Sequence, residues 1–136
     1  KRQGWVEGRL GIIIDGTGKD VAKITRQKNA LDQLGYQCAM IFANTSLDVA
    51  QQRNKERTRT LPEKSVEQMW NGVQKNIGAF QQYFGNKNFI IVDNNDAGED
   101  VFNKVYKRIR GLVTKKPTKI QARQWIANEL KKKDRR

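Results

Sequence analysis

The sequence of 136 residues contains no histidine and a single cysteine, Cys38. One cysteine cannot build a disulfide framework, and the usual zinc ligands are scarce, so we expect neither a disulfide-stabilised fold nor a metal site. No apolar stretch approaches the length of a membrane span, and no signal peptide is visible. A cytoplasmic protein is therefore the expectation. The sequence also opens on Lys1 without an initiator methionine, which suggests a fragment or a processed product.

Acidic residues are few: 14 Asp and Glu stand against 27 Lys and Arg, for a net charge of +13. Such an excess favours anionic partners, namely nucleotides, nucleic acid or acidic surfaces. Much of it lies between residues 115 and 136, where a solvated tail would explain it without any ligand. We expect one α/β domain over residues 1–112, followed by a basic C-terminal helix and tail over residues 113–136.

Three short apolar runs, at residues 10–14, 37–43 and 89–93, read as buried strands. Amphipathic patterns between and after them predict helices at residues 20–34, after a cap at Asn44 or Ser46, from Ser65 to Phe84, at residues 99–112, and after Pro117, where Thr118 and Gln121 have the spacing of a capping box. Strands that alternate with helices indicate an α/β fold with a mostly parallel sheet.

The first apolar run ends on a turn that contains Asp15, Gly16 and Thr17. The following Gly18-Lys19 pair has the look of a phosphate-binding P-loop, but that motif needs a glycine where Ile13 stands and a Ser or Thr where Asp20 stands. We therefore interpret Asp20 as the N-cap of the next helix. Ligands of α/β sheets sit at the carboxyl ends of the strands, which makes Asp15 and Thr17 candidate site residues, although Asp15 has the alternative of simply capping the turn.

A cluster of arginines follows the second predicted strand. Arg53 and Arg57 are four residues apart, which places them on one face of a continuous helix, and Arg59 lies just before the Leu61-Pro62 break. The cluster is either a site for anions or a solvated helix face. Cys38, in a predicted strand, is interpreted as a small apolar residue and not a nucleophile.

The order of these elements resembles that of small P-loop kinases. It is most similar to the polynucleotide kinase and zeta-toxin-like branch, which includes predicted kinases of tailed phages. The resemblance covers residues 10–94 and rests on a strand ending in Asp-Gly-Thr, a strand ending at Ala43-Asn44-Thr45, the arginine element, the Leu-Pro turn and a strand ending in Asp93-Asn94. The family's Gly-x-x-x-x-Gly-Lys-Ser/Thr loop has no match. The chain thus resembles the C-terminal portion of a three-layer α/β/α, P-loop NTPase-like fold that lacks its first strand or strands.

This resemblance implies transfer of a phosphoryl group from ATP, with Mg²⁺, to a hydroxyl acceptor, in the host cytoplasm if the gene is viral. Asp15 would orient or deprotonate the acceptor, while Arg53 and Arg57 would stabilise the charge on the transferring phosphate. Supporting roles in binding substrate or nucleotide fall on Thr17, Arg26, Lys55 and Arg59. Because the chain's own motifs include no phosphate loop, we expect it to bind neither ATP nor Mg²⁺ through them and to be inactive alone. Whether the chain itself is an enzyme stays open.

Two alternatives remain at this point. A basic module could hold nucleic acid through phosphate contacts without any chemistry, and its affinity would then fall steeply with salt. An incomplete sheet could instead self-associate as a homo-oligomer through an exposed edge.

Overall fold

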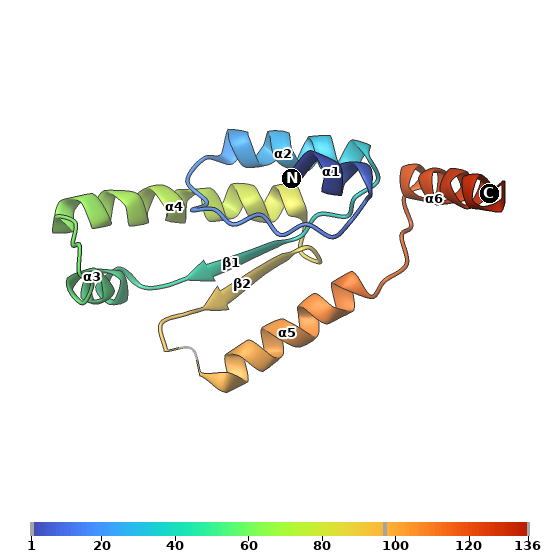
Figure 1. Cartoon of the computed structure of the whole chain (residues 1–136). Helices are drawn as coiled ribbons and strands as arrows, with labels where there is room; N and C mark the ends of the chain where they lie inside the picture. Colours follow the sequence, from blue (N-terminus) through green and yellow to red (C-terminus); the bar gives the residue numbers. More distant parts are fainter. Residues whose placement is uncertain (1, 97, 136) are drawn as a thin grey trace.

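We describe the fold from a computed structural model, which covers residues 2–96 and 98–135. Each of the two strands follows one pair of helices and precedes another, as Figure 1 shows. In order, the elements are α1 (Arg2–Glu7), α2 (Val21–Gln33), β1 (Met40–Asn44), α3 (Leu47–Lys55), α4 (Glu63–Phe84), β2 (Phe89–Asp93), α5 (Glu99–Val113) and α6 (Ile120–Asp134).

The two strands β1 and β2 lie side by side and run parallel. Met40 pairs with Phe89 at one end and Asn44 with Asp93 at the other. Two of the three predicted strands and their parallel direction are therefore confirmed. Parallel strands need a crossover connection, and α3 with α4 supplies it.

The third predicted strand, at residues 10–14, is wrong, because these residues form neither helix nor strand. The run begins near Tyr36, whose hydroxyl donates a hydrogen bond to the Leu10 carbonyl at 2.9 Å. Ile13 is 99% exposed, and among the described residues no strand pairs with the run. Apolar composition alone does not make a strand, because the backbone needs a ladder of hydrogen bonds from a partner.

Local signals at the helix ends are largely confirmed. Asp20 caps α2, with its carboxylate accepting a hydrogen bond from the Lys23 amide at 3.0 Å. Ser46 caps α3 in the same way through the amide of Val49. Gly35 follows α2 with a φ of +96°, a conformation that favours glycine. The capping box predicted after Pro117 is wrong, since the residue at the N-cap of α6 is Lys119 and no side chain bonds to the helix there.

The core is small and aromatic. Phe80 is 1% exposed, and it packs with Phe42 at a distance of 6.5 Å between ring centroids. Phe84 and Phe89 complete this cluster, and apolar side chains of α2 cover its margin. The cluster thus joins β1 and β2 to α4 and, through it, to α2.

Figure 1 shows α2 and α4 on one side of the two strands and α5 on the other. The fold is thus of mixed helix and strand type, built on a small two-stranded parallel sheet. Within residues 2–96 and 98–135, no helix combines the length and apolar character needed to cross a bilayer.

The start of α6 is held against the end of α2. The Lys119 ammonium donates hydrogen bonds to the Asp32 carboxylate at 3.0 Å and to the Tyr36 carbonyl at 2.6 Å. A Cβ atom placed on Gly35 would lie 2.5 Å from the backbone nitrogen of Ala122, so the two segments approach more closely than any side chain allows. Further along α6, the Arg9 guanidinium lies 5.3 Å from the ring centre of Trp125, a cation–π contact.

Asp32 and Cys38 lie in this same region. Partial burial acts to raise the pKa of Asp32, but hydrogen bonds from Lys28 and Lys119 outweigh it and hold this pKa below its usual value. Burial, together with the neighbouring Asp32 carboxylate, raises the pKa of Cys38 to about 11. The thiol is therefore protonated at neutral pH, which agrees with its interpretation as a small apolar residue.

Candidate functional site

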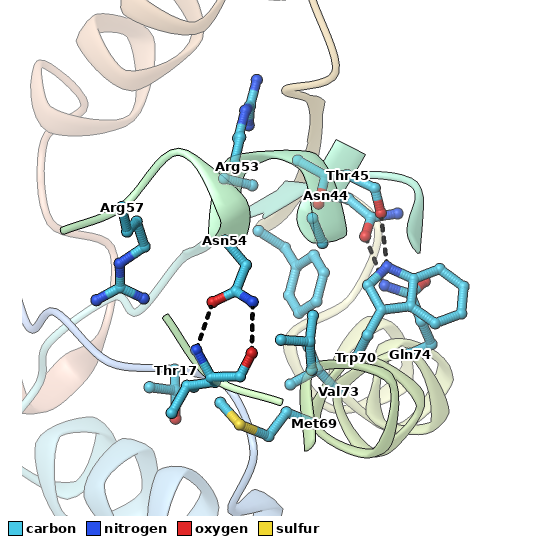
Figure 2. A pocket seen from close by; sticks show the side chains of 15 residues that line it. Thr17, Asn44, Thr45, Arg53, Asn54, Arg57, Met69, Trp70, Val73 and Gln74 are labelled. Carbon is cyan, nitrogen blue, oxygen red and sulfur yellow. Dashed lines mark hydrogen bonds between the residues drawn. The ribbon is translucent and has the colours of Figure 1, made fainter. Parts of the chain in front are cut away.

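A pocket of about 330 Å³ opens beside the carboxyl end of β1. Its walls come from β1, α3, α4 and the segment that precedes α2 (Figure 2). This is the edge at which α/β sheets present side chains to ligands. The lining residues are Thr17, Phe42, Ala43, Asn44, Thr45, Ala50, Arg53, Asn54, Arg57, Leu61, Val66, Met69, Trp70, Val73 and Gln74.

Polar contacts fix the strand ends at the rim of this pocket. The Asn94 amide donates to the Asn44 carbonyl at 2.8 Å, which extends the β1–β2 ladder by one bond. The Asn95 side chain then accepts a hydrogen bond from the Ser46 amide at 2.6 Å. The two loops that leave the sheet are thereby tied to each other, and α3 starts from a fixed position.

Helix α4 supplies two side chains that bond to the end of β1. The Trp70 indole donates to the Thr45 carbonyl at 2.8 Å, and the Gln74 amide donates to the Asn44 side chain at 2.7 Å. Figure 2 shows both bonds on the same side of the pocket. Trp70 thus combines an apolar face in the pocket wall with a polar contact at its rim.

Arg53 lines the pocket, but its guanidinium is engaged elsewhere. It donates to the backbone carbonyls of Asn94 at 2.6 Å and Asn95 at 3.2 Å. In Figure 2 its side chain points away from Asn54 and Thr17. Arg53 therefore holds the loop after β2 against α3.

Arg57 lies outside the helix that carries Arg53. The sequence predicted that Arg53 and Arg57 share one helix face. This prediction is wrong, because helix α3 ends at Lys55 with Glu56 as its C-cap and Arg57 is not part of the helix. Instead Arg57 lies in the following turn and lines the pocket. Among the described residues, its guanidinium has no hydrogen-bond or ion-pair partner, so it is available to a ligand.

Thr17 reaches the pocket because the segment before α2 is anchored on α4. The Asn76 side chain donates to the carbonyls of Gly18 at 2.9 Å and Lys19 at 3.1 Å. Gly18 has a φ of +71°, and a Cβ atom there would touch the Phe42 ring at 3.4 Å. The backbone thus lies directly on the aromatic core and carries Thr17 to the opening.

The other predicted site residues do not line this pocket: Asp15, Arg26, Lys55 and Arg59. Asp15 is exposed in the segment two residues before Thr17. Lys55 forms an ion pair with Glu63 at 3.3 Å, across the base of the turn that holds Arg57. The structure therefore gathers Thr17, Arg53 and Arg57 out of the seven predicted residues and leaves the remaining four at the surface.

Asn54 is a lining residue that sequence reasoning missed. It is the one buried polar residue in the part of the chain that the structure describes, and its amide bonds twice to the backbone of Leu61. Asn54 takes this role because the chain turns back so that Leu61 lies next to it. The local sequence pattern does not show which two residues the turn brings together.

The charge of the pocket has one sign. Its two ionisable lining residues are the arginines, and no carboxylate contributes to its described walls. Apolar side chains from α4, among them Met69 and Val73, form the opposite wall. An opening with the Arg57 guanidinium on one side and apolar surface on the other suits a ligand that has an anionic end and an apolar body.

Comparison with protein-family models matches residues 2–105 to the Zeta toxin family. The chain belongs to this family. The Zeta toxin family is P-loop kinase-like, and membership suggests a kinase-like, nucleotide-binding function. The match extends from α1 into α5 and leaves α6 outside. No curated protein and no solved structure matches the chain.

Proposed function

We propose that the pocket beside β1 binds the phosphate groups of a nucleotide or nucleotide-like substrate, as part of a kinase that transfers a phosphoryl group to a hydroxyl acceptor. The observation that carries this proposal is the lining itself, in which Arg57 is available and no carboxylate opposes it. Guanidinium groups form short, charge-assisted hydrogen bonds with phosphate oxygens and stabilise charge that is spread over a transferring phosphoryl group.

Each residue then has a distinct role. Arg57 contacts the phosphate directly, and Arg53 orders the loop after β2 and adds positive charge beside it. The Thr17 hydroxyl is a second hydrogen-bonding group at the opening, and Asp15, two residues earlier, orients or deprotonates the acceptor. Arg26, Lys55 and Arg59 lie at the surface, where they add to the positive field that attracts an anionic ligand.

The residues present do not fit a complete site for ATP and Mg²⁺. At the N-terminus of α2, the end of a helix that a P-loop would offer to phosphate, the Asp20 carboxylate already takes the place of an anion and accepts a hydrogen bond from the Lys23 amide. Within the described residues, no three His, Cys, Asp or Glu side chains gather as metal ligands. We therefore propose that this chain binds a phosphate-bearing ligand without turning it over.

The arrangement of the helices supports a larger sheet of the P-loop kinase type. Helices α2 and α4 lie on one side of the strands and α5 lies on the other (Figure 1). This arrangement corresponds to the two outer layers of a three-layer α/β/α fold. Buried parallel sheets of this kind are covered on both faces. We propose that β1 and β2 are part of such a sheet in the complete kinase fold.

Titration with ADP tests the proposed function, with Trp70 in the pocket wall as an intrinsic fluorescence probe. We expect Arg57→Ala to weaken ADP binding about tenfold or more, because a hydrogen bond to a charged group is lost. The matched control is Arg108→Ala, which removes the same charge from the exposed face of α5, outside the pocket.

Equal losses in the two variants would contradict a specific phosphate site and would favour the nucleic-acid-binding alternative, in which affinity follows total charge and falls steeply with salt. Conversion of ATP to ADP by the purified chain would contradict the proposal that it binds without turnover.

A further inference from the structure

The turn between α3 and α4 is closed by a buried amide. Asn54, the penultimate residue of α3, is 6% exposed. Its side-chain nitrogen donates to the Leu61 carbonyl at 2.8 Å, and its side-chain oxygen accepts from the Leu61 amide at 3.0 Å. Figure 2 shows the two bonds running in parallel from the Asn54 side chain. The amide thus pairs with the Leu61 backbone as a neighbouring strand would.

Few side chains could take this place. The pairing needs one donor and one acceptor on the same planar group, which asparagine provides and which neither aspartate at neutral pH nor an apolar residue does. Asn54 is buried but Leu61 is 40% exposed, so loss of the amide would leave the Leu61 backbone amide and carbonyl without protein partners in a partly shielded site. The pairing is therefore costly to break, although it lies at the surface end of a helix.

The closed turn carries the arginines. Residues 55–60 form an exposed excursion between the two paired residues, and they include Arg57 and Arg59. Two other contacts cross its base: the ion pair between Lys55 and Glu63, and a 2.9 Å bond from the Gln51 amide to the Glu63 carbonyl. Both of these are exposed, so the Asn54 amide is the part of the base that is shielded from solvent.

We propose that Asn54 is a positioning residue for the phosphate site: its bonds to Leu61 fix the arginine turn, defined as residues 55–60, and thereby hold Arg57 at the pocket. This inference rests on the proposed function. Asn54 acts through Arg57 and not by contact with the ligand, because both polar atoms of its side chain are occupied by the backbone of Leu61. Without the amide, the turn opens and Arg57 spends less time at the pocket.

Native-state proteolysis tests the clamp without any ligand. Residues 55–60 are exposed, and trypsin should cleave after Arg57 and Arg59 faster when the turn opens; the fragments can be quantified by mass spectrometry. We expect Asn54→Ala to speed cleavage at these two bonds about tenfold, as the loss of a pair of partly buried hydrogen bonds would. The matched control is Asn71→Ala, an exposed asparagine of α4 for which the described residues provide no side-chain hydrogen bond.

Pyrophosphate binding tests the link to the site, and a double-mutant cycle makes the test specific. We expect Asn54→Ala to weaken pyrophosphate binding by about threefold to tenfold in the wild-type background and to have no further effect in Arg57→Ala, because the two residues act as one unit. A second control, Ile90→Val, loosens the core at a residue that is 2% exposed and should leave pyrophosphate affinity unchanged in the folded protein.

The outcomes separate the two proposals. Faster cleavage in Asn54→Ala, with no pyrophosphate binding even by the wild-type chain, would support the clamp and overturn the phosphate site. Binding by the wild-type chain with equal affinity in Asn54→Ala would overturn the positioning role. Additive losses in the double variant would also overturn it, since Asn54 would then act independently of Arg57. Unchanged cleavage would overturn the clamp itself.

Discussion

Lys119 and Asp32 are 87 residues apart in the sequence, yet their side chains form a hydrogen-bonded ion pair of 3.0 Å that fixes where α6 begins. The same carboxylate accepts a bond from Lys28 at 2.6 Å, so one aspartate ties the last helix to α2. The basic C-terminal segment is therefore attached at its start, and the ionic part of this attachment depends on the charge of a single carboxylate.

This attachment should weaken in acid. The pKa of Asp32 is lower in the folded chain than its usual value, so its stabilising contribution is present above the unfolded-state pKa of about 3.9 and is lost as pH falls through the folded value. Urea unfolding of wild type and Asp32→Asn should differ by about 1 kcal/mol at pH 7, and the difference should shrink towards zero near pH 3. A difference that is constant with pH would contradict the ion-pair account.

The close approach at Gly35 should make this position intolerant of any side chain. Gly35→Ala combines a strained positive φ with a clash against the Ala122 backbone, so we expect a loss of about 2 kcal/mol or more, with faster hydrogen exchange at the start of α6. Gly85→Ala is the matched control, because Gly85 also has a positive φ, of +80°, but open space around its Cβ position. It should lose stability without faster exchange in α6, and equal exchange in the two variants would argue against the contact.

Cys38 should react slowly while the chain is folded. A rise of its pKa to about 11 from the usual 9.0 reduces the thiolate fraction at pH 7.5 by about a hundredfold, and partial burial restricts access further. We expect iodoacetamide to label the native chain at least about a hundredfold more slowly than the chain in concentrated urea. Native labelling at the unfolded rate would show that the thiol is exposed and unperturbed.

The aromatic cluster should dominate the stability of the fold. Phe80→Ala removes a fully buried ring that contacts Phe42, and the resulting cavity should cost about 3–5 kcal/mol. In a domain with so small a core, such a loss is comparable to the whole free energy of unfolding. Met69→Ala, at a side chain that is 56% exposed, serves as the control and should change the unfolding midpoint far less.

Sequence patterns predicted the elements whose signals are local. The side chains of Asp20 and Ser46 cap the helices that they begin, and the predicted run 37–43 overlaps β1 while the run 89–93 matches β2. The run at residues 10–14 has the same composition, but a strand also depends on a partner elsewhere in the chain, and composition does not reveal whether that partner is present.

The residues of the pocket beside β1 were also predictable only in part, because their positions depend on contacts between distant parts of the chain. Thr17 and Arg57 line the pocket. The arginine cluster pointed to Arg57, whereas the prediction for Thr17 rested on a strand at residues 10–14 that the structure does not contain. The helical spacing of Arg53 and Arg57 was misleading because α3 ends two residues before Arg57, and the boundary is set by the bonds between Asn54 and Leu61. Such boundaries depend on tertiary contacts that no periodicity contains.

The two-stranded sheet also affects how strongly copies of the chain associate in solution. Within the described residues, neither β1 nor β2 has a second strand beside it, and Ile41 and Ile91 remain about half exposed. Backbone groups and apolar side chains of this kind promote cross-chain pairing, whereas a net charge of +13 repels a second copy. Because salt shortens the range of that repulsion from about 10 Å at 0.1 M to about 3 Å at 1 M, the chain should stay dispersed in dilute buffer and associate as sodium chloride is added. Light scattering that stays flat across this range would show that charge is not what keeps the copies apart.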